Sequence, residues 1–275
     1  MSAPNASLGI WVDGVEGAAV PADDRGLAYG DGVFETVLVR NGVARFLDAH
    51  IARLSRGCAR LGIPFDVAGV QPDLGAALAR APSLAILKIV VTRGSAPRRG
   101  YAPSASDARR VVSLWTTGDT SALAAGVDLG IARTRAAINP AVAGLKHLNR
   151  LDNVLAAAEI TADAFDVVML DANDDVVSGS ACNLFVVQGR RLATPRLDRA
   201  GVAGVMRAIV LRESPKLGLI TEERALTLAE LRGADGMFVT NARIGVVPVR
   251  RVGEHAFRMN DIALALRAHL EALDA

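Results

Sequence analysis

The stretch "AGLKHLNRLDNVLAAAE", residues 143–159, places a lysine and a histidine just before a segment with helical periodicity. Lys146 stands out because the chain has only three lysines (Lys88, Lys146 and Lys216) against 28 arginines. Burial beside Leu145 and a following helix N-terminus would both favour a neutral amine, the form that attacks a carbonyl. Lys146 is therefore a candidate nucleophile, although most lysines beside a helix start are simply solvated.

The composition is that of a globular protein of one large or two ordinary domains. Of its 275 residues 51% are hydrophobic and 22% charged, and the formal net charge is only +2. The basic residues are scattered, and aromatic residues make up 4% of the chain. Because single-strand binders depend on basic grooves and aromatic stacking, the sequence argues against nucleic-acid binding.

Motifs for metals, disulfides, targeting and dinucleotides are missing from the sequence. Cys58 and Cys182 lack zinc or redox spacing and are expected to be buried thiols. The N-terminus does not resemble a signal peptide, and the apolar run around Lys88 is too short to span a membrane. We therefore expect a cytoplasmic protein without membrane contact and without a metal. "GDGVFE", residues 30–35, lacks the complete GxGxxG pattern of dinucleotide sites.

Periodicity predicts a mixture of strands and helices. Asn41-Gly42 is a strong hairpin signal between strands at 33–40 and 43–46, and Asp48 is a predicted N-cap for a helix over 49–62. Further strands are predicted at 85–93, 109–117, 127–132, 166–171, 183–187, 236–240 and 245–252, and further helices at about 149–164, after Gly204, and at about 259–273.

Small and polar residues at 118–125 predict a linker between two domains. The predicted domains are a smaller N-terminal α+β domain, 1–117, and a larger C-terminal domain, 126–275. Hairpins mixed with helices indicate an α/β (α+β) class, with a site between the domains.

Seven motifs occur in order from residue 24 to residue 249: "DRGLAYGDGVFETV", "HIARL", "RGSAPRRGY", "GLKHLNRLDNVLAAAE", "ACNLF", "TPRLDRAGVAGVMR" and "VTNARIGVVPV". Together they resemble the class IV (fold type IV) pyridoxal-phosphate enzymes. The resemblance implies the two-domain D-amino-acid aminotransferase-like fold, a C-terminal domain that binds pyridoxal 5'-phosphate, and a homodimer. "KHLNRL", "RGY" and "GVAGVMR" are most similar to the 4-amino-4-deoxychorismate lyases within that family.

The resemblance assigns roles residue by residue. Lys146 would carry the cofactor and be the catalytic residue. Arg53 would hold the cofactor phosphate, for which a guanidinium fork is suited. Backbone N–H groups at a helix N-terminus and in a turn would complete the phosphate site, with plain helix capping as the alternative; these belong to Val205, Met206, Asn241 and Ala242.

One position departs from the family pattern. Family members usually carry a glutamate five residues before the asparagine of "NLF", where it holds a proton on the pyridine nitrogen. Counting back from Asn183 gives Ser178, which can hydrogen-bond but cannot stabilise a pyridinium as a carboxylate does. The cofactor should then be a weaker electron sink. Asp174 or Asp175 in a shifted turn is the alternative to the missing glutamate, although their spacing does not favour it.

The resemblance also implies the reaction and its substrate. The small-molecule substrate would be 4-amino-4-deoxychorismate, which a lyase of folate biosynthesis cleaves at a carbon–oxygen bond to p-aminobenzoate and pyruvate. Its carboxylates would meet Arg99 and Tyr101 of "RGY", with Tyr29 nearby. Arg98 is either a further contact or part of a solvated loop, and His147 and Asn149 would orient the lysine or cap the helix. The alternatives are an aminotransferase for D- or branched-chain amino acids, or a cofactor-binding protein without turnover.

Overall fold

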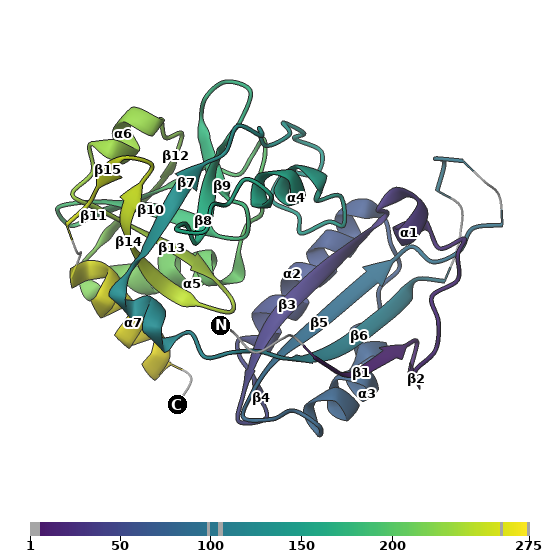
Figure 1. The fold of residues 1–275 in the computed structure, drawn as a ribbon. Coiled ribbons are helices and arrows are strands. Elements are labelled where there is room, and N and C mark those ends of the chain that lie inside the picture. Colours follow the sequence, from purple (N-terminus) through teal and green to yellow (C-terminus); the bar gives the residue numbers. More distant parts are fainter. Residues whose placement is uncertain (1–5, 98–99, 104–106, 259–260, 274–275) are drawn as a thin grey trace. The chain divides into compact units, whose positions relative to one another are not determined.

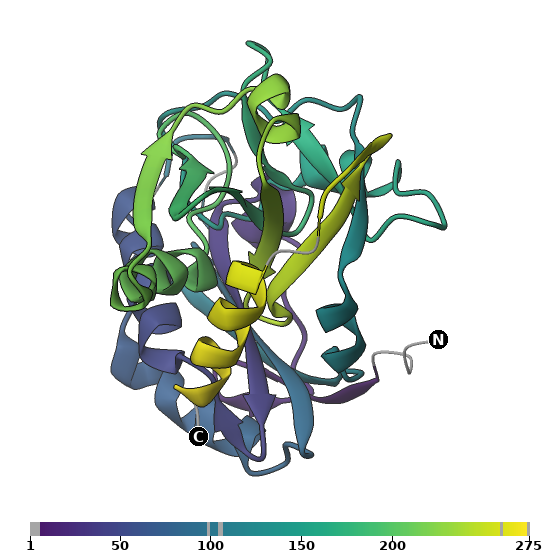
Figure 2. The same ribbon diagram turned by 90° about the vertical axis from the view of Figure 1, so that its left-hand side faces the viewer.

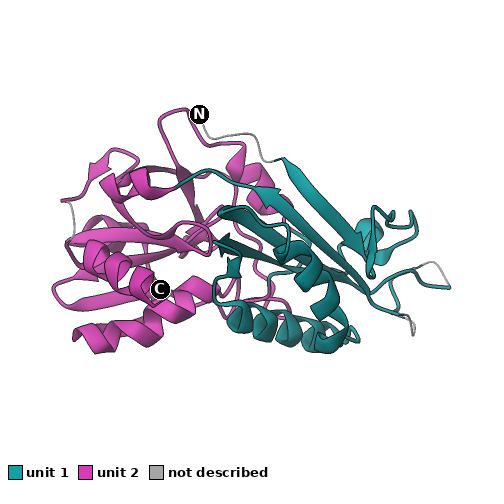
Figure 3. Ribbon diagram, turned by 90° about the horizontal axis from the view of Figure 1, so that it is seen from below, with its two compact units in different colours: residues 1–119, 146–149 teal, residues 120–145, 150–275 magenta. Residues whose placement is uncertain are grey.

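The computed structural model describes residues 6–97, 100–103, 107–258 and 261–273 (Figure 1). The chain divides into two compact units (Figure 3). Unit 1 comprises residues 1–119 and 146–149, and unit 2 comprises residues 120–145 and 150–275. The segment with Lys146 thus belongs with the N-terminal unit. Within the predicted linker, residues Ser121–Ala125 form a short 3-10 helix, η1, and the linker role itself stays a prediction.

Unit 1 is built on a six-stranded sheet with the order β2-β1-β6-β5-β3-β4. Its strands pair antiparallel throughout. The strands are β1 (Ser7–Val12), β2 (Val15–Glu16), β3 (Gly32–Arg40), β4 (Val43–Ala44), β5 (Leu84–Thr92) and β6 (Arg109–Thr116), and the helices are α1 (Arg25–Tyr29), α2 (Leu47–Leu61) and α3 (Val67–Leu78).

Side-chain alternation along β3 and β5 separates the two faces of this sheet. Val33, Val37, Leu87 and Ile89 are buried in a core that includes side chains of α2 and α3. Phe34, on the opposite face, is only partly buried.

The hairpin predicted at Asn41-Gly42 is confirmed. Both residues have positive φ, 51° and 78°, as a type I′ turn requires, and they join β3 to β4.

Helix α2 corrects the predicted cap. Phe46, in a left-handed conformation with φ 50°, precedes the helix, and no side chain caps it. Asp48 lies inside the first turn instead, where its charge still suits the positive end of the helix dipole. The predicted end of the helix is confirmed, since Gly62 follows it with φ 63°.

Unit 2 is built on a nine-stranded mixed sheet. Its order is β12-β11-β10-β13-β14-β7-β8-β9, with β15 paired to β14. The strands are β7 (Val127–Ile131), β8 (Asp166–Leu170), β9 (Val176–Gly179), β10 (Asn183–Gln188), β11 (Arg191–Pro195), β12 (Ile220–Arg224), β13 (Gly236–Asn241), β14 (Gly245–Val252) and β15 (His255–Ala256).

The helices of unit 2 are α4 (Leu151–Ala157), α5 (Val205–Glu213), α6 (Leu228–Arg232) and α7 (Asp261–Ala272), with a 3-10 turn, η2, at Ser214–Leu217. Helix α5 contacts β13, α7 contacts β14, and the two helices touch each other (Figure 2). They bury apolar side chains such as Ile209 and Leu266.

Helix α4 is shorter than the helix predicted over 149–164. Past its end, the carboxylate of Glu159 accepts hydrogen bonds from the backbone N–H groups of Arg133 and Thr134 and from the Thr134 hydroxyl. These long-range bonds hold the chain in a turn although the apolar spacing continues.

The interpretation of the two cysteines is confirmed. Cys58 and Cys182 are free and buried, and burial raises the pKa of Cys58 to about 12. In the part of the chain that the structure describes, no helix has the length and apolarity needed to cross a membrane.

Candidate active site

Lys146 lies on an extended segment beside β3, which corrects its predicted place at a helix start. The backbone N–H of Phe34 donates to the Lys146 carbonyl at 2.9 Å, and His147 forms an antiparallel bridge with Val33. Helix α4 begins only at Leu151. The Lys146 ammonium lies 4.2 Å from the centre of the Phe34 ring. Strand pairing and a cation–π contact therefore position this lysine, not a helix dipole.

The neighbours of Lys146 also do not cap the helix. Arg150 is the residue before α4, and its helix has no side-chain cap. The Asn149 side-chain amide donates instead to the Gly30 carbonyl at 3.1 Å. A Cβ at Gly30 would lie 2.4 Å from the Asn149 side-chain oxygen, so a glycine is required there. This contact ties the lysine segment to the turn before β3.

Arg53, on α2, is held by a buried carboxylate of β3. Its Nε and Nη2 atoms donate to the two oxygens of Glu35 at 2.7 and 2.5 Å. The Nδ1 atom of His50 lies 2.6 Å from the same carboxylate. Glu35 is 1% exposed. The fork geometry fixes the direction of the guanidinium.

The pKa of Glu35 is lowered by this arrangement. Burial acts to raise the pKa, and the hydrogen bonds and charges of His50 and Arg53 together outweigh it. The carboxylate therefore stays ionised and remains an acceptor for Arg53.

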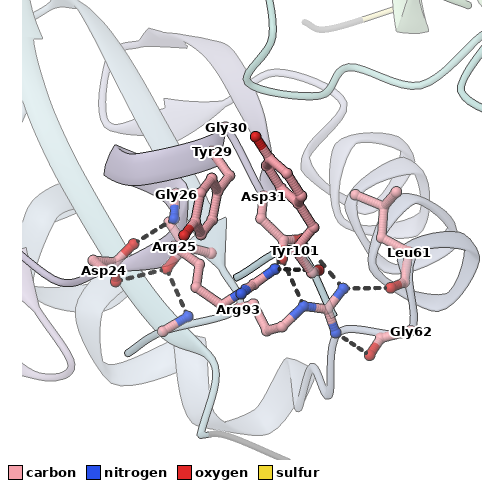
Figure 4. Close-up of polar contacts among 12 residues, drawn as sticks. Asp24, Arg25, Gly26, Tyr29, Gly30, Asp31, Leu61, Gly62, Arg93 and Tyr101 are labelled. Carbon is pink, nitrogen blue, oxygen red and sulfur yellow. Dashed lines mark hydrogen bonds and ion pairs between the residues drawn. The ribbon is translucent and has the colours of Figure 1, made fainter. Parts of the chain in front are cut away.

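Tyr29 and Tyr101 form an edge-to-face pair, with ring centres 5.5 Å apart (Figure 4). The Arg25 guanidinium lies over the Tyr29 ring at 4.9 Å and donates to the carbonyls of Gly100 and Tyr101 at 2.8 and 3.0 Å. Tyr101 is 86% exposed. The structure thus brings together two of the predicted substrate residues, while Arg99, and Arg98 beside it, lie outside the described residues.

Asp31 anchors this tyrosine pair to the sheet. It accepts hydrogen bonds from Arg25 at 2.9 Å and from Arg93 at 2.7 Å. Arg93 also donates to the carbonyls of Leu61 and Gly62 at the end of α2 (Figure 4). Burial acts to raise the Asp31 pKa, but the two arginines lower it overall. One carboxylate therefore links α1, the end of β5 and the end of α2.

Val205 and Met206 begin helix α5 in unit 2. Gly204 precedes the helix, and no side chain caps it. The first N–H groups of a nine-residue helix without a side-chain cap suit an anion, because they combine free donors with the positive end of the helix dipole.

Asn241 organises the neighbouring turn that contains Ala242. Its side-chain oxygen accepts from the N–H groups of Arg243 and Ile244, both at 3.0 Å. Its amide donates to the Ala181 carbonyl and contacts the Cys182 sulfur, both at 3.3 Å. The turn after β13 is therefore fastened to the turn before β10.

Asn183 joins these turns to helix α5. It pairs with Thr240 across the sheet, and its amide donates to the Val202 carbonyl at 2.9 Å. A Cβ at Gly204 would lie 2.1 Å from the Asn183 oxygen, so the helix start approaches as closely as a glycine permits. The predicted phosphate donors of unit 2 thus share one region.

Ser178 is buried on β9, and its hydroxyl donates to the Gly179 carbonyl at 2.8 Å. Asp166 lies close by, where it accepts from the N–H and hydroxyl of Ser180 at 2.9 and 2.6 Å and from the Ala181 N–H at 3.2 Å. Asp166 is the organising residue of this turn, and sequence reasoning did not find it.

Asp174 and Asp175, the alternatives to the missing glutamate, each lie beside an arginine. Asp174 pairs with Arg135 at 2.8 Å, and Asp175 faces Arg199 at 3.9 Å. Both lie in the turn between β8 and β9, so each carboxylate already has an arginine beside it.

Sequence reasoning also missed Glu35 and His50. The only available signal was their position: Glu35 directly follows "GDGVF", and His50 lies three residues before Arg53. That spacing puts His50 and Arg53 on one helix face, but only the fold shows that Glu35 meets them.

Comparisons with known proteins show which family this chain resembles. The sequence profile of the amino-transferase class IV family matches residues 32–252. The chain is 36% identical to the aminodeoxychorismate lyase of Vibrio harveyi over 87% of this chain and 90% of that protein. It is 30% identical to the D-alanine aminotransferase of Bacillus licheniformis over 85% and 83%.

A solved structure extends the likeness to the fold. The 4-amino-4-deoxychorismate lyase of Pseudomonas aeruginosa matches with a TM-score of 0.87 and 42% identity, covering 96% of this chain and 98% of that one. The predicted fold type IV architecture is therefore confirmed. The chain belongs to the class IV aminotransferase family.

Proposed function

We propose that this protein is an aminodeoxychorismate lyase that converts 4-amino-4-deoxychorismate to p-aminobenzoate and pyruvate in folate biosynthesis. The observation that carries the proposal is its likeness to lyases over nearly full length, 36% and 42% identical, against 30% for the D-alanine aminotransferase. The family contains both activities, so the site must favour one of them.

We propose pyridoxal 5'-phosphate as the cofactor. Within unit 1, Lys146 is the proposed attachment amine and Arg53 offers a guanidinium suited to a phosphate. Within unit 2, the uncapped start of α5 offers backbone donors of the kind that bind an anion. Asn241 and Ala242 supply the adjoining turn. The cofactor, when bound, withdraws electrons from the amine-bearing carbon of the substrate.

Lys146 moves the proton. Its amine accepts the proton from the amine-bearing ring carbon, and the resulting ammonium donates a proton to the departing enolpyruvate oxygen as the carbon–oxygen bond breaks. The Phe34 ring, 4.2 Å from the nitrogen, stabilises the charged form between the two transfers. General acid–base help of this kind contributes roughly 10²–10⁴-fold, and formation of an aromatic ring adds to the driving force.

Ser178 favours elimination over transamination. A transaminase must hold negative charge on its cofactor until a different carbon is protonated, which a carboxylate beside the pyridine nitrogen assists. In the elimination the electrons leave with the enolpyruvate group. A hydroxyl already bound to the Gly179 carbonyl offers the pyridine no charge, so the site is better suited to the lyase reaction.

The test is release of pyruvate and p-aminobenzoate from 4-amino-4-deoxychorismate. The purified protein loaded with pyridoxal phosphate should release both in equal amounts. Lys146→Ala should abolish release. The control is Lys216→Ala, which removes a lysine that pairs with Glu213 in unit 2 and has no proposed role in the reaction; this variant should still release both products. Equal activity of wild type and Lys146→Ala would refute the proposal.

The second candidate is an aminotransferase, which the 30% identity to a D-alanine aminotransferase supports. It predicts conversion of the cofactor to its amine form by D-alanine or a branched-chain amino acid, without pyruvate release from 4-amino-4-deoxychorismate. A binding protein without turnover would give neither reaction.

We further propose a homodimer. Helix α4 exposes Leu151, Val154 and Leu155, which are 76%, 59% and 58% accessible. Three neighbouring apolar side chains on one short helix form a surface that a second copy could cover.

A further inference from the structure

Lys88 is a second lysine at the same aromatic ring as Lys146. Its ammonium lies 5.4 Å from the centre of the Phe34 ring, while that of Lys146 lies 4.2 Å from it. Both belong to unit 1. Two of the three lysines of a chain with 28 arginines therefore meet at one side chain.

Strand pairing fixes this arrangement. Phe34 on β3 lies between the Lys146 segment, which pairs with it through the Phe34 N–H, and β5, where Lys88 is opposite Thr36 and Val90 is opposite Phe34. Lys88 and Phe34 both point to the face opposite the core that includes α2 and α3.

The residues paired with Lys88 on the adjacent strands carry no charge. Lysine is depleted in strands, and the neighbours of Lys88 on its own face are Ile86 and Val90 along β5 and Thr36 and Ser113 directly across from it, none of them charged. Lys88 is exposed, and no carboxylate of the described residues lies within ion-pair distance of it. Lys216 differs, since its ammonium is 2.8 Å from Glu213.

We propose that Lys88 is a substrate-binding residue that holds a carboxylate of the substrate while Lys146 acts on the amine-bearing carbon. This inference rests on the proposed lyase function. The substrate has two carboxylates, one on the ring and one on the enolpyruvyl arm, and Lys88 offers a cation at the same aromatic ring as Lys146. An ammonium–carboxylate contact gives affinity, and it discriminates against ligands that lack the charge.

The experiment uses the holoenzyme and three variants: Lys88→Gln, Lys88→Arg and Lys216→Gln. The KM for 4-amino-4-deoxychorismate should rise about tenfold or more in Lys88→Gln, as expected for loss of a charged hydrogen bond, with a smaller change in kcat. Lys88→Arg should recover most of the affinity, and Lys216→Gln should behave as wild type.

Inhibition by the two products shows which carboxylate of the substrate Lys88 binds. Weaker inhibition of Lys88→Gln by p-aminobenzoate assigns Lys88 to the ring carboxylate, and weaker inhibition by pyruvate assigns it to the enolpyruvyl carboxylate. The absorbance of the bound cofactor and the melting temperature should stay as in wild type, which separates substrate binding from folding and cofactor loading.

An unchanged KM together with unchanged inhibition by both products would overturn this inference and leave the lyase function intact. A changed cofactor spectrum in Lys88→Gln would overturn it too, because the residue would then act on the cofactor. Absence of pyruvate release by the wild-type protein is a different outcome, which refutes the proposed function itself.

Discussion

The guanidinium of Arg53 donates two hydrogen bonds to the carboxylate of Glu35, and both side chains are largely buried. If Arg53 binds the cofactor phosphate, Glu35 is the residue that aims it. Because the Nε and one terminal nitrogen are occupied, the remaining edge of the guanidinium has a fixed direction. This relationship gives the first prediction.

Glu35→Gln should weaken binding of pyridoxal phosphate and destabilise unit 1. Breaking a buried ion pair while leaving one charge behind costs about 3 kcal/mol or more, and the amide cannot accept two hydrogen bonds from Arg53 in the same way. We expect the dissociation constant of the cofactor to rise about tenfold, measured by titrating the apoprotein and following absorbance. The control is Glu222→Gln, which alters a more exposed pair with Arg191. Unchanged cofactor affinity in Glu35→Gln would show that Glu35 does not position the phosphate ligand.

Ser178→Glu should increase transamination. A carboxylate at this position would stabilise a protonated pyridine and strengthen the cofactor as an electron sink. The rate at which D-alanine converts the bound cofactor to its amine form, followed by absorbance, should rise about tenfold, which corresponds to about 1.4 kcal/mol of barrier. Ser178→Ala, which removes only the hydrogen bond to Gly179, should not produce this rise. Loss of cofactor binding in Ser178→Glu would undercut the argument.

Arg25→Lys should impair substrate binding without affecting the cofactor. Lysine keeps the charge but cannot reach the Gly100 and Tyr101 carbonyls and Asp31 together, as the guanidinium does. The Tyr29–Tyr101 pair should lose its fixed position, so we expect KM to rise about tenfold with a smaller change in kcat. Steady-state kinetics and the absorbance of the bound cofactor provide the two measurements. Equal losses in kcat and in cofactor loading would indicate a purely structural role.

Acid should remove the contribution of Glu159 to stability. Its pKa is lowered from 4.5 to about 2, mainly by the Thr134 hydroxyl and then by the N–H groups of Arg133 and Thr134. A carboxyl whose folded pKa is depressed stabilises the protein fully above the unfolded pKa, and this stabilisation is lost as the pH falls from about 4.5 towards 2.

Urea unfolding at several pH values tests this expectation. Glu159→Gln should be less stable than wild type at pH 7, and the difference should shrink across that acid window. Glu254→Gln changes an exposed carboxyl in the turn between β14 and β15 and serves as the control. A difference that does not depend on pH would contradict the assignment.

A charge on helix α4 should separate the proposed dimer. Leu155→Glu places a carboxylate among Leu151 and Val154, where burial against a second copy would desolvate it. Light scattering coupled to size exclusion should report a monomer for this variant and a dimer for wild type. Val15→Glu, on the exposed β2 strand, should leave the dimer intact. A wild-type monomer would refute the proposal directly.

The sequence determined the elements whose signals are local. Asn41-Gly42 formed the predicted hairpin because its backbone preference requires no distant partner, and Gly62 ended α2 for the same reason. The ordered motifs likewise determined the family, since they span most of the chain. Local signals failed at two places. Asp48 was predicted to cap α2, but Phe46 precedes that helix. The apolar spacing predicted a helix up to residue 164, but α4 ends earlier, before Glu159 and its bonds to a distant part of the chain.

Only the tertiary structure decided how Lys146 is held. Sequence spacing put it before a helix, whereas pairing with β3, more than a hundred residues earlier in the chain, put it on an extended segment over Phe34. The same pairing brought Lys88 to that ring. The sequence by itself therefore singled out Lys146 as the candidate reactive lysine, and the sheet decided its surroundings, because cross-strand contacts join residues whose separation along the chain carries no local pattern.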